Sequence, residues 1–101
     1  MQVFKFGGAS VKDADGVKNV ATVLQTMGAG EKLVIVSAMG KTTNAMEAIV
    51  TAYFDDKSSL PEHIEHTVAY HREITNHLFE KGDEVLEKIK ELFAELKGFL
   101  A

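Results

Sequence analysis

The stretch that decides the fold lies at the start of the chain, where residues 2–10 read Gln-Val-Phe-Lys-Phe-Gly-Gly-Ala-Ser. The apolar run over residues 2–6 predicts a short buried strand, which Gly7 and Gly8 end. Adjacent glycines let the backbone approach a ligand without Cβ atoms in the way. Successive N–H groups before a helix can bind phosphate oxygens, and Lys5 adds a positive charge. On spacing alone, a plain glycine turn remains the commoner interpretation.

The first half of the chain, residues 1–54, reads strand–helix–strand–helix. Between Asp13 and Gly28 one helical face carries Val17, Val20, Leu24 and Met27. The apolar run Leu33–Val36 is typical of a strand covered on both faces. A second helix is expected from about Asn44, with an inner side formed by Met46, Ile49, Val50, Tyr53 and Phe54. This order implies parallel strands joined by a right-handed crossover.

The second half, residues 55–101, is helical in pattern. Ser59-Leu60-Pro61-Glu62 predicts a capping box with a proline in the first turn. Apolar or packed positions then recur at Ile64, Val68, His71, Thr75 and Leu78. Gly82 is expected to end this helix and Asp83 to cap the next, whose apolar positions are Val85, Leu86, Ile89, Leu92, Phe93, Leu96, Phe99 and Leu100. The pattern predicts an antiparallel helical hairpin.

A second loop of interest joins the second strand to its helix, over residues 36–44 (Val-Ser-Ala-Met-Gly-Lys-Thr-Thr-Asn). Its Gly40-Lys41-Thr42 triplet imitates the end of a P-loop. A P-loop needs a glycine five residues earlier, where this chain has Ile35, so we reject that interpretation. Helix capping alone would account for several of the hydroxyl and amide side chains here.

The two loops follow the carboxyl ends of neighbouring parallel strands, where open α/β sheets bind their ligands. Together they form a polar, amide-rich site without a carboxylate, which suits an anionic ligand. The candidate residues are Lys5, Gly7, Gly8 and Ser10 in the first loop, and Ser37, Thr43 and Asn44 in the second.

Composition and charge exclude several other classes of protein. The 101 residues include no cysteine, which excludes disulfides, thiolate metal sites and a cysteine nucleophile. Residues 1–54 carry a net charge of +1 and residues 55–101 a net charge of −5, so no nucleic-acid surface is expected. With neither a signal peptide nor a run of about 18 apolar residues, we expect a soluble, cytoplasmic chain without a membrane partner.

The four histidines do not predict a metal site. His63 and His66 share a helical face, but His77 lies about 16 Å further along the axis. They cannot complete one tetrahedral site, and we expect solvated or packed histidines and no protein-bound metal.

The two loops resemble the N-terminal signatures of aspartokinases, members of the amino-acid kinase superfamily. The resemblance rests on Lys5-Phe6-Gly7-Gly8-Ala9-Ser10-Val11 and on residues 36–44, and covers about residues 3–44. One residue departs from the pattern, since Ala9 stands where the family usually has threonine. This removes a hydroxyl and leaves the backbone donors intact.

The resemblance implies phosphoryl transfer from ATP to the β-carboxylate of L-aspartate, giving 4-phospho-L-aspartate for lysine, threonine and methionine synthesis. It implies that Lys5 is catalytic, that Lys5, Phe6, Gly7, Gly8 and Ser10 bind ATP, and that Ser37, Thr43 and Asn44 bind aspartate. Mg²⁺ would be carried by the nucleotide.

The resemblance also implies that residues 1–101 are the N-terminal part of one catalytic domain. Residues 1–54 would form its βαβα phosphate-site half and residues 55–101 a helical hairpin insert. We expect such a piece to be inactive by itself and the parent to be a homo-oligomer. Two alternatives stay open: a non-catalytic helical dimerisation module, and another nucleotide-binding protein of the amino-acid-kinase type.

Overall fold

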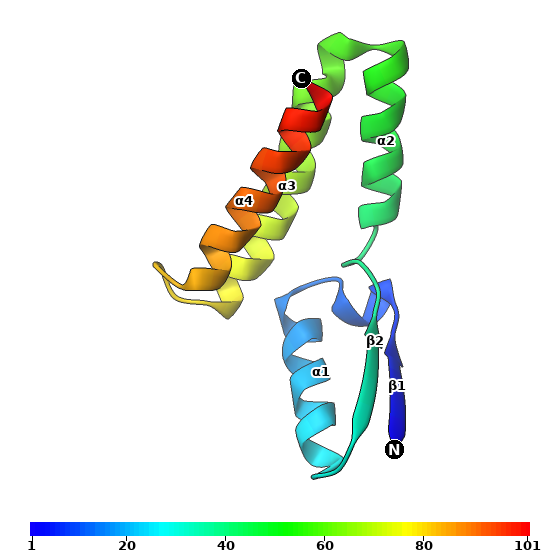
Figure 1. The fold of residues 1–101 in the computed structure, drawn as a ribbon, viewed down its shortest axis with the longest axis vertical. Coiled ribbons are helices and arrows are strands. Elements are labelled where there is room, and N and C mark those ends of the chain that lie inside the picture. The colour runs from blue at the N-terminus through cyan, green and yellow to red at the C-terminus, as the bar shows by residue number, and fades with distance from the viewer. The chain divides into compact units, whose positions relative to one another are not determined.

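The computed structural model describes all residues, Met1–Ala101, as an α/β chain rich in helix (Figure 1). Their contacts divide into two compact units, residues 1–43 and 44–101, each of which is described by itself. The elements are β1 (Gln2–Phe6), the 3₁₀ helix η1 (Gly8–Val11), α1 (Ala14–Thr26), β2 (Lys32–Val36), α2 (Thr42–Asp55), the 3₁₀ helix η2 (Lys57–Ser59), α3 (Leu60–Leu78) and α4 (Glu84–Leu100).

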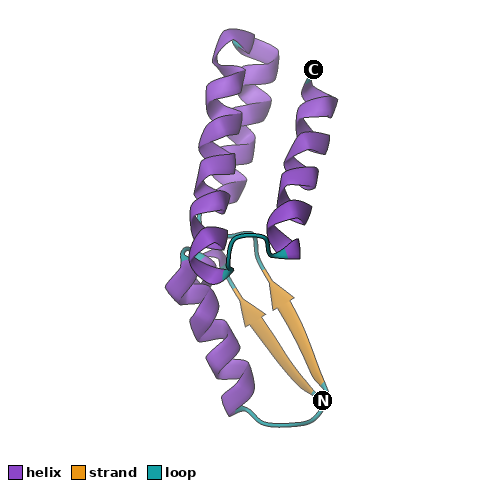
Figure 2. Cartoon of the chain, turned by 90° about the vertical axis from the view of Figure 1, so that its left-hand side faces the viewer, coloured by secondary structure: helices purple, strands orange, loops and turns teal.

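The first unit contains a parallel two-stranded sheet, as predicted. The strands pair from Gln2 opposite Lys32 to Phe6 opposite Val36, and Figure 2 shows both arrows pointing the same way. The crossover helix α1 begins where the Asp13 carboxylate accepts a hydrogen bond of 2.8 Å from the Gly16 amide. This cap satisfies one of the amide groups that a helix start leaves without a partner.

The expectation that the second strand is covered on both faces is wrong for this chain. All four residues of Leu33–Val36 are exposed, and Val36 keeps 54% of its surface. A sheet of two strands has an open edge on each side. The first unit supplies one crossover helix, which can cover at most one sheet face.

Gly16, in the first turn of α1, lies so close to the backbone of Ser10 that the position requires glycine. A Cβ atom there would lie 2.5 Å from the Ser10 carbonyl oxygen. Alanine favours a helix over glycine by about 1 kcal/mol, but overpacking costs about 1–3 kcal/mol. We therefore expect Gly16→Ala to lower the thermal unfolding midpoint.

Gly98, within α4, is the matched control, because a Cβ atom there meets nothing within 4 Å. We expect Gly98→Ala to raise the midpoint slightly, by less than the full helix preference of about 1 kcal/mol, because Gly98 lies in the last turn of α4. Equal responses of the two variants in a thermal melt would contradict the close-contact argument.

The core of the second unit forms where α2 meets α3, from Ile49, Ala52, Leu60 and Ile64. The predicted inner side of α2 is therefore wrong in part. Met46 and Val50 are exposed, and Phe54 keeps 77% of its surface. A helix presents one stripe to its neighbour, and here residues 49, 52 and 53 form that stripe, which turns residues 50 and 54 outward.

The predicted capping box at the start of α3 is also wrong. Ser59 has helical dihedral angles and makes no side-chain cap. Its hydroxyl instead donates to the Asp56 carbonyl oxygen at 2.9 Å. The reason is that η2 runs directly into α3, so Ser59 lacks the extended backbone of a capping residue. Pro61 does lie in the first turn, as predicted.

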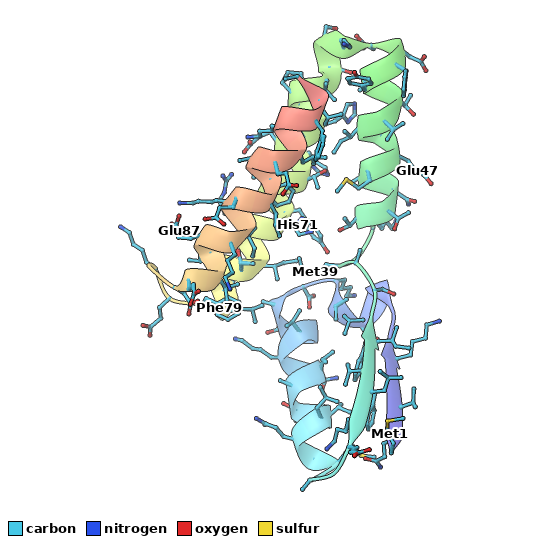
Figure 3. The ribbon with its side chains drawn as sticks, viewed as in Figure 1. Met1, Met39, Glu47, His71, Phe79 and Glu87 are labelled. Atoms are coloured by element: carbon cyan, nitrogen blue, oxygen red, sulfur yellow. The ribbon has the colours of Figure 1, made fainter.

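Helices α3 and α4 contact each other in the second unit. The ring of His71, which Figure 3 labels on α3, lies 5.3 Å from that of Phe93 on α4. Leu100 packs on the core. Helix α3 ends at Leu78, four residues before Gly82, which lies in the following turn. Asp83 caps α4 as predicted, by accepting from the Val85 amide at 2.9 Å.

Asp56, between α2 and α3, provides a prediction on pH. A hydrogen bond of 2.6 Å from the Ser58 hydroxyl lowers the pKa of this carboxyl below its ordinary value of 3.8. Desolvation opposes this shift, and further hydrogen bonds from Ser58 and Ser59 support it. A lowered pKa stabilises the fold above pH 3.8, and this contribution is lost as the pH falls through the folded-state pKa. Thermal melts should show Asp56→Asn less stable than the wild type at neutral pH and equal to it in strong acid. A difference that persists in strong acid would contradict this assignment.

Candidate functional site

The two loops begin side by side at the carboxyl ends of β1 and β2. Beyond the paired strands, the Ser37 amide donates to the Phe6 carbonyl oxygen at 2.9 Å, which extends the parallel ladder by one bond. Both loops therefore leave the sheet at the same end, the carboxyl end of the two strands. This is the placement that the sequence predicts for a ligand site of an open parallel sheet.

The first loop is a single turn of 3₁₀ helix inserted between β1 and α1. Gly7 is extended, and the Ser10 amide donates to the Gly7 carbonyl oxygen at 3.0 Å. Val11, only 3% exposed, anchors the end of the turn. The first N–H groups of a helical turn have no intrahelical acceptor, so they are donors suited to an anion.

Gly8 is the point where the two loops meet. Its carbonyl oxygen accepts a hydrogen bond of 3.1 Å from the Gly40 amide. A Cβ atom on Gly8 would lie 2.6 Å from the Gly40 oxygen and 3.3 Å from the Ala38 oxygen. Since both neighbours are backbone atoms, only glycine lets the loops approach this closely.

The second loop contains a tight turn between Met39, which Figure 3 labels, and Thr42. The Thr42 amide and hydroxyl both donate to the Met39 carbonyl oxygen, at 3.1 and 2.5 Å. Within this turn Gly40 has a φ of 55°, in the left-handed region that favours glycine. Thr42 is also the first residue of α2.

The structure brings together the two backbone segments that hold most of the predicted site residues. Lys5 is an exposed residue of β1 opposite Ile35. Phe6 ends β1 half-buried, with its ring stacked 6.4 Å from that of Phe4. The other predicted residues are Gly7 and Gly8 in the first turn, exposed Ser10, exposed Ser37 after β2, exposed Thr43, and Asn44, which belongs to the second unit.

Two residues of this arrangement are absent from the sequence-based prediction. Gly40 and Thr42 form the contact between the loops and the turn behind it. The one signal of them in the sequence is the Gly40-Lys41-Thr42 triplet, which imitates the end of a P-loop. The contact itself joins residues more than thirty positions apart in the sequence and could not be read from spacing.

The charges around the loops are positive. Residues 5–10 and 36–44 include Lys5 and Lys41 and no acidic residue.

In the chain as a whole, no three His, Asp or Glu side chains gather closely enough to hold a metal ion. His71 and His77 each place Nδ1 within 2.8 Å of a backbone oxygen, that of Thr67 and that of Glu73 respectively. No helix of the chain combines the length and apolar character that crossing a bilayer requires.

The chain is similar to three plant proteins from Arabidopsis thaliana. It is 38% identical over 64 residues to aspartokinase 2, chloroplastic, and 48% identical over 42 residues to aspartokinase 1, chloroplastic. It is 29% identical over 99 residues to the chloroplastic bifunctional aspartokinase/homoserine dehydrogenase 2. The aligned segments cover 59%, 42% and 98% of this chain, but only 12%, 7% and 11% of the relatives.

These similarities confirm the resemblance to aspartokinases that the two loop motifs predict. A family model, described as the amino acid kinase family, matches residues 1–97, and so includes both loops and nearly all of the helical second unit. The chain belongs to the amino acid kinase family.

Proposed function

We propose that this chain supplies the phosphate-site part of an aspartate kinase. The reaction moves the terminal phosphoryl group of ATP to the β-carboxylate of L-aspartate, giving 4-phospho-L-aspartate at the start of lysine, threonine and methionine synthesis. The observation that supports this most is the backbone contact between Gly8 and Gly40. It joins a loop rich in amide donors to a second loop rich in hydroxyl groups.

The first loop is suited to the phosphates of ATP. In the proposed roles, the Gly7 and Gly8 amides donate to phosphate oxygens, with Phe6 and Ser10 at the two ends of the turn. Lys5 neutralises the charge that develops on the transferred group. Phosphoryl transfer depends mainly on alignment and on such charge stabilisation.

The second loop is suited to the amino acid. Ser37, Thr43 and Asn44 would donate to or accept from L-aspartate. A carboxylate with a pKa near 4 is ionised and nucleophilic at pH 7. The attacking group needs no general base, which agrees with a site built without histidine or acidic residues.

Mg²⁺ fits this site only as part of the nucleotide complex. The loops carry no carboxylate to bind it, and Mg²⁺ keeps phosphate oxygens and water as ligands in such sites. Bound there, it would offset phosphate charge alongside Lys5.

The assignment also defines a proposed domain layout and setting. Residues 1–101 would be the N-terminal part of one catalytic domain, with residues 1–54 as the βαβα half and residues 55–101 as an antiparallel hairpin insert. We place the protein in the cytoplasm and expect a homo-oligomer. This location differs from that in the names of the plant relatives, which are chloroplastic.

The test is a titration of the ¹⁵N-labelled chain with MgATP, followed by NMR. The proposal predicts shifts concentrated on Gly7, Gly8 and Ser10, and none for an equal concentration of magnesium chloride. L-aspartate should then shift Ser37, Thr43 and Asn44 more than L-glutamate does. MgATP shifts that leave the first loop unaffected would contradict the proposed phosphate site.

A second candidate function, non-catalytic self-association, is supported by an apolar surface on α4. Leu92 and Phe99, spaced seven residues apart on one helical face, keep 65% and 77% of their surface. Exposed apolar patches of this kind mark association sites. Sedimentation of the wild type and of Phe99→Glu decides this point: a dimer that the substitution abolishes supports association, and a monomer in both cases excludes it.

A further inference from the structure

We propose that Gly40 and Thr42 are positioning residues, which hold the second loop against the first. Neither residue has a role in the family-derived assignment above. A connected series of backbone groups links them to the first loop. The Met39–Thr42 turn contains the Gly40 amide, and this amide donates to the Gly8 carbonyl oxygen. The inference rests on the proposed function only for its effect on ATP.

The series starts at Thr42, a polar residue that is only 7% exposed. A buried hydroxyl must be hydrogen-bonded, and this one donates to the Met39 carbonyl oxygen at 2.5 Å. The Thr42 amide donates to the same oxygen at 3.1 Å. Two donors from one residue on one acceptor fix the Met39–Thr42 turn more tightly than the amide alone would.

The Met39–Thr42 turn also fixes the backbone conformation of Gly40. Its φ of 55° is a conformation that other residues adopt only with strain. In this conformation the Gly40 amide donates to the Gly8 carbonyl oxygen at 3.1 Å. The Thr42 hydroxyl therefore acts on the phosphate loop through the turn, without touching a ligand.

The consequence is a fixed separation between the two loops. If one loop holds the phosphoryl donor and the other the acceptor carboxylate, their spacing sets the distance of the reacting atoms. That distance must be about 3–3.5 Å for transfer, so a turn that loosens also weakens alignment.

The test compares Thr42→Val, which keeps the shape and removes the hydroxyl, with Thr42→Ser, which keeps the hydroxyl. Thr67→Val is the matched control, because Thr67 is another buried threonine whose hydroxyl donates to a backbone oxygen, that of His63 at 3.2 Å. Amide hydrogen exchange is followed by NMR. The Val17 amide of α1, which donates to the Asp13 carbonyl oxygen at 3.1 Å, is the internal reference for general loosening of the first unit. MgATP affinity is measured for each variant.

Thr42→Val should accelerate exchange of the Gly40 amide by about threefold to tenfold relative to Val17, the range for one lost hydrogen bond. Thr42→Ser should restore the wild-type rate, and Thr67→Val should leave it unchanged. Unaltered Gly40 exchange in Thr42→Val, or equal acceleration at Val17, would overturn the positioning role.

The MgATP measurement separates this inference from the proposed function. Affinity should fall in Thr42→Val by about the same factor as the exchange changes, and recover in Thr42→Ser. Faster Gly40 exchange with unchanged affinity would overturn the link between the loops and the nucleotide. A wild-type chain that binds no MgATP would count against the proposed function, while the exchange data would still decide the role of Thr42.

Discussion

Replacing Gly8 by alanine is expected to separate the two loops and to destabilise the first unit by about 1–3 kcal/mol, the usual cost of overpacking. The added Cβ atom would lie 2.6 Å from the Gly40 oxygen, closer than such atoms are found in proteins. Backbone must move to relieve this contact, and the hydrogen bond between the Gly40 amide and the Gly8 oxygen is the first interaction to be lost. Denaturant unfolding measures the stability, and the NMR shift of the Gly40 amide reports the broken bond.

Gly7→Ala is the matched control for the stability effect. Gly7 has an extended backbone that any residue can adopt, and a Cβ atom there meets nothing within 4 Å. We expect this variant to unfold at the wild-type denaturant concentration. Its added methyl group would still lie beside the proposed phosphates, so MgATP binding should weaken in both variants. Equal stability of the Gly7 and Gly8 variants would show that the loops are not in the close contact described.

Removing the charge of Lys5 should have the largest effect on ligand binding. A hydrogen bond to a charged group contributes about 1.5–3 kcal/mol, so Lys5→Ala should weaken MgATP binding by about tenfold to a hundredfold. Lys5 is exposed on β1, so its truncation should leave the fold and its thermal midpoint nearly unchanged. Isothermal titration calorimetry measures the affinity.

Lys18→Ala is the control for charge in general. Lys18 is an exposed residue of α1 in the same unit, and its loss changes the net charge by the same amount. It should weaken MgATP binding only slightly, since an exposed charge outside the two loops is screened by salt. Equal losses in the two lysine variants would reduce the proposed role of Lys5 to a general electrostatic effect.

Local patterns predicted the elements of this chain well and their environments poorly. Gln2–Phe6 is a strand, a helix follows Asp13, and Asp83 caps α4, all as predicted. Strand boundaries and caps depend on neighbours within a few residues, so the sequence contains them. The expected burial of Leu33–Val36 is wrong, because burial depends on which other elements cover a strand.

The errors in the second unit have the same origin. Ser59 has the composition of a capping residue, but the preceding 3₁₀ turn holds its backbone in a helical conformation. On α2, Val50 and Phe54 look as apolar as Ile49. Only the direction from which α3 approaches decides that Ile49 is buried and Phe54 exposed.

The candidate site, too, could be predicted from the sequence only in part. By itself, the sequence determined the two loop motifs, their place after two parallel strands and the lack of carboxylates around them, because these follow from residue order and strand direction. Only the tertiary structure decided that Gly8 and Gly40 are in backbone contact and that Thr42 fixes the turn behind them. That contact depends on the pairing register of β1 and β2, which brings together residues that are far apart in the chain.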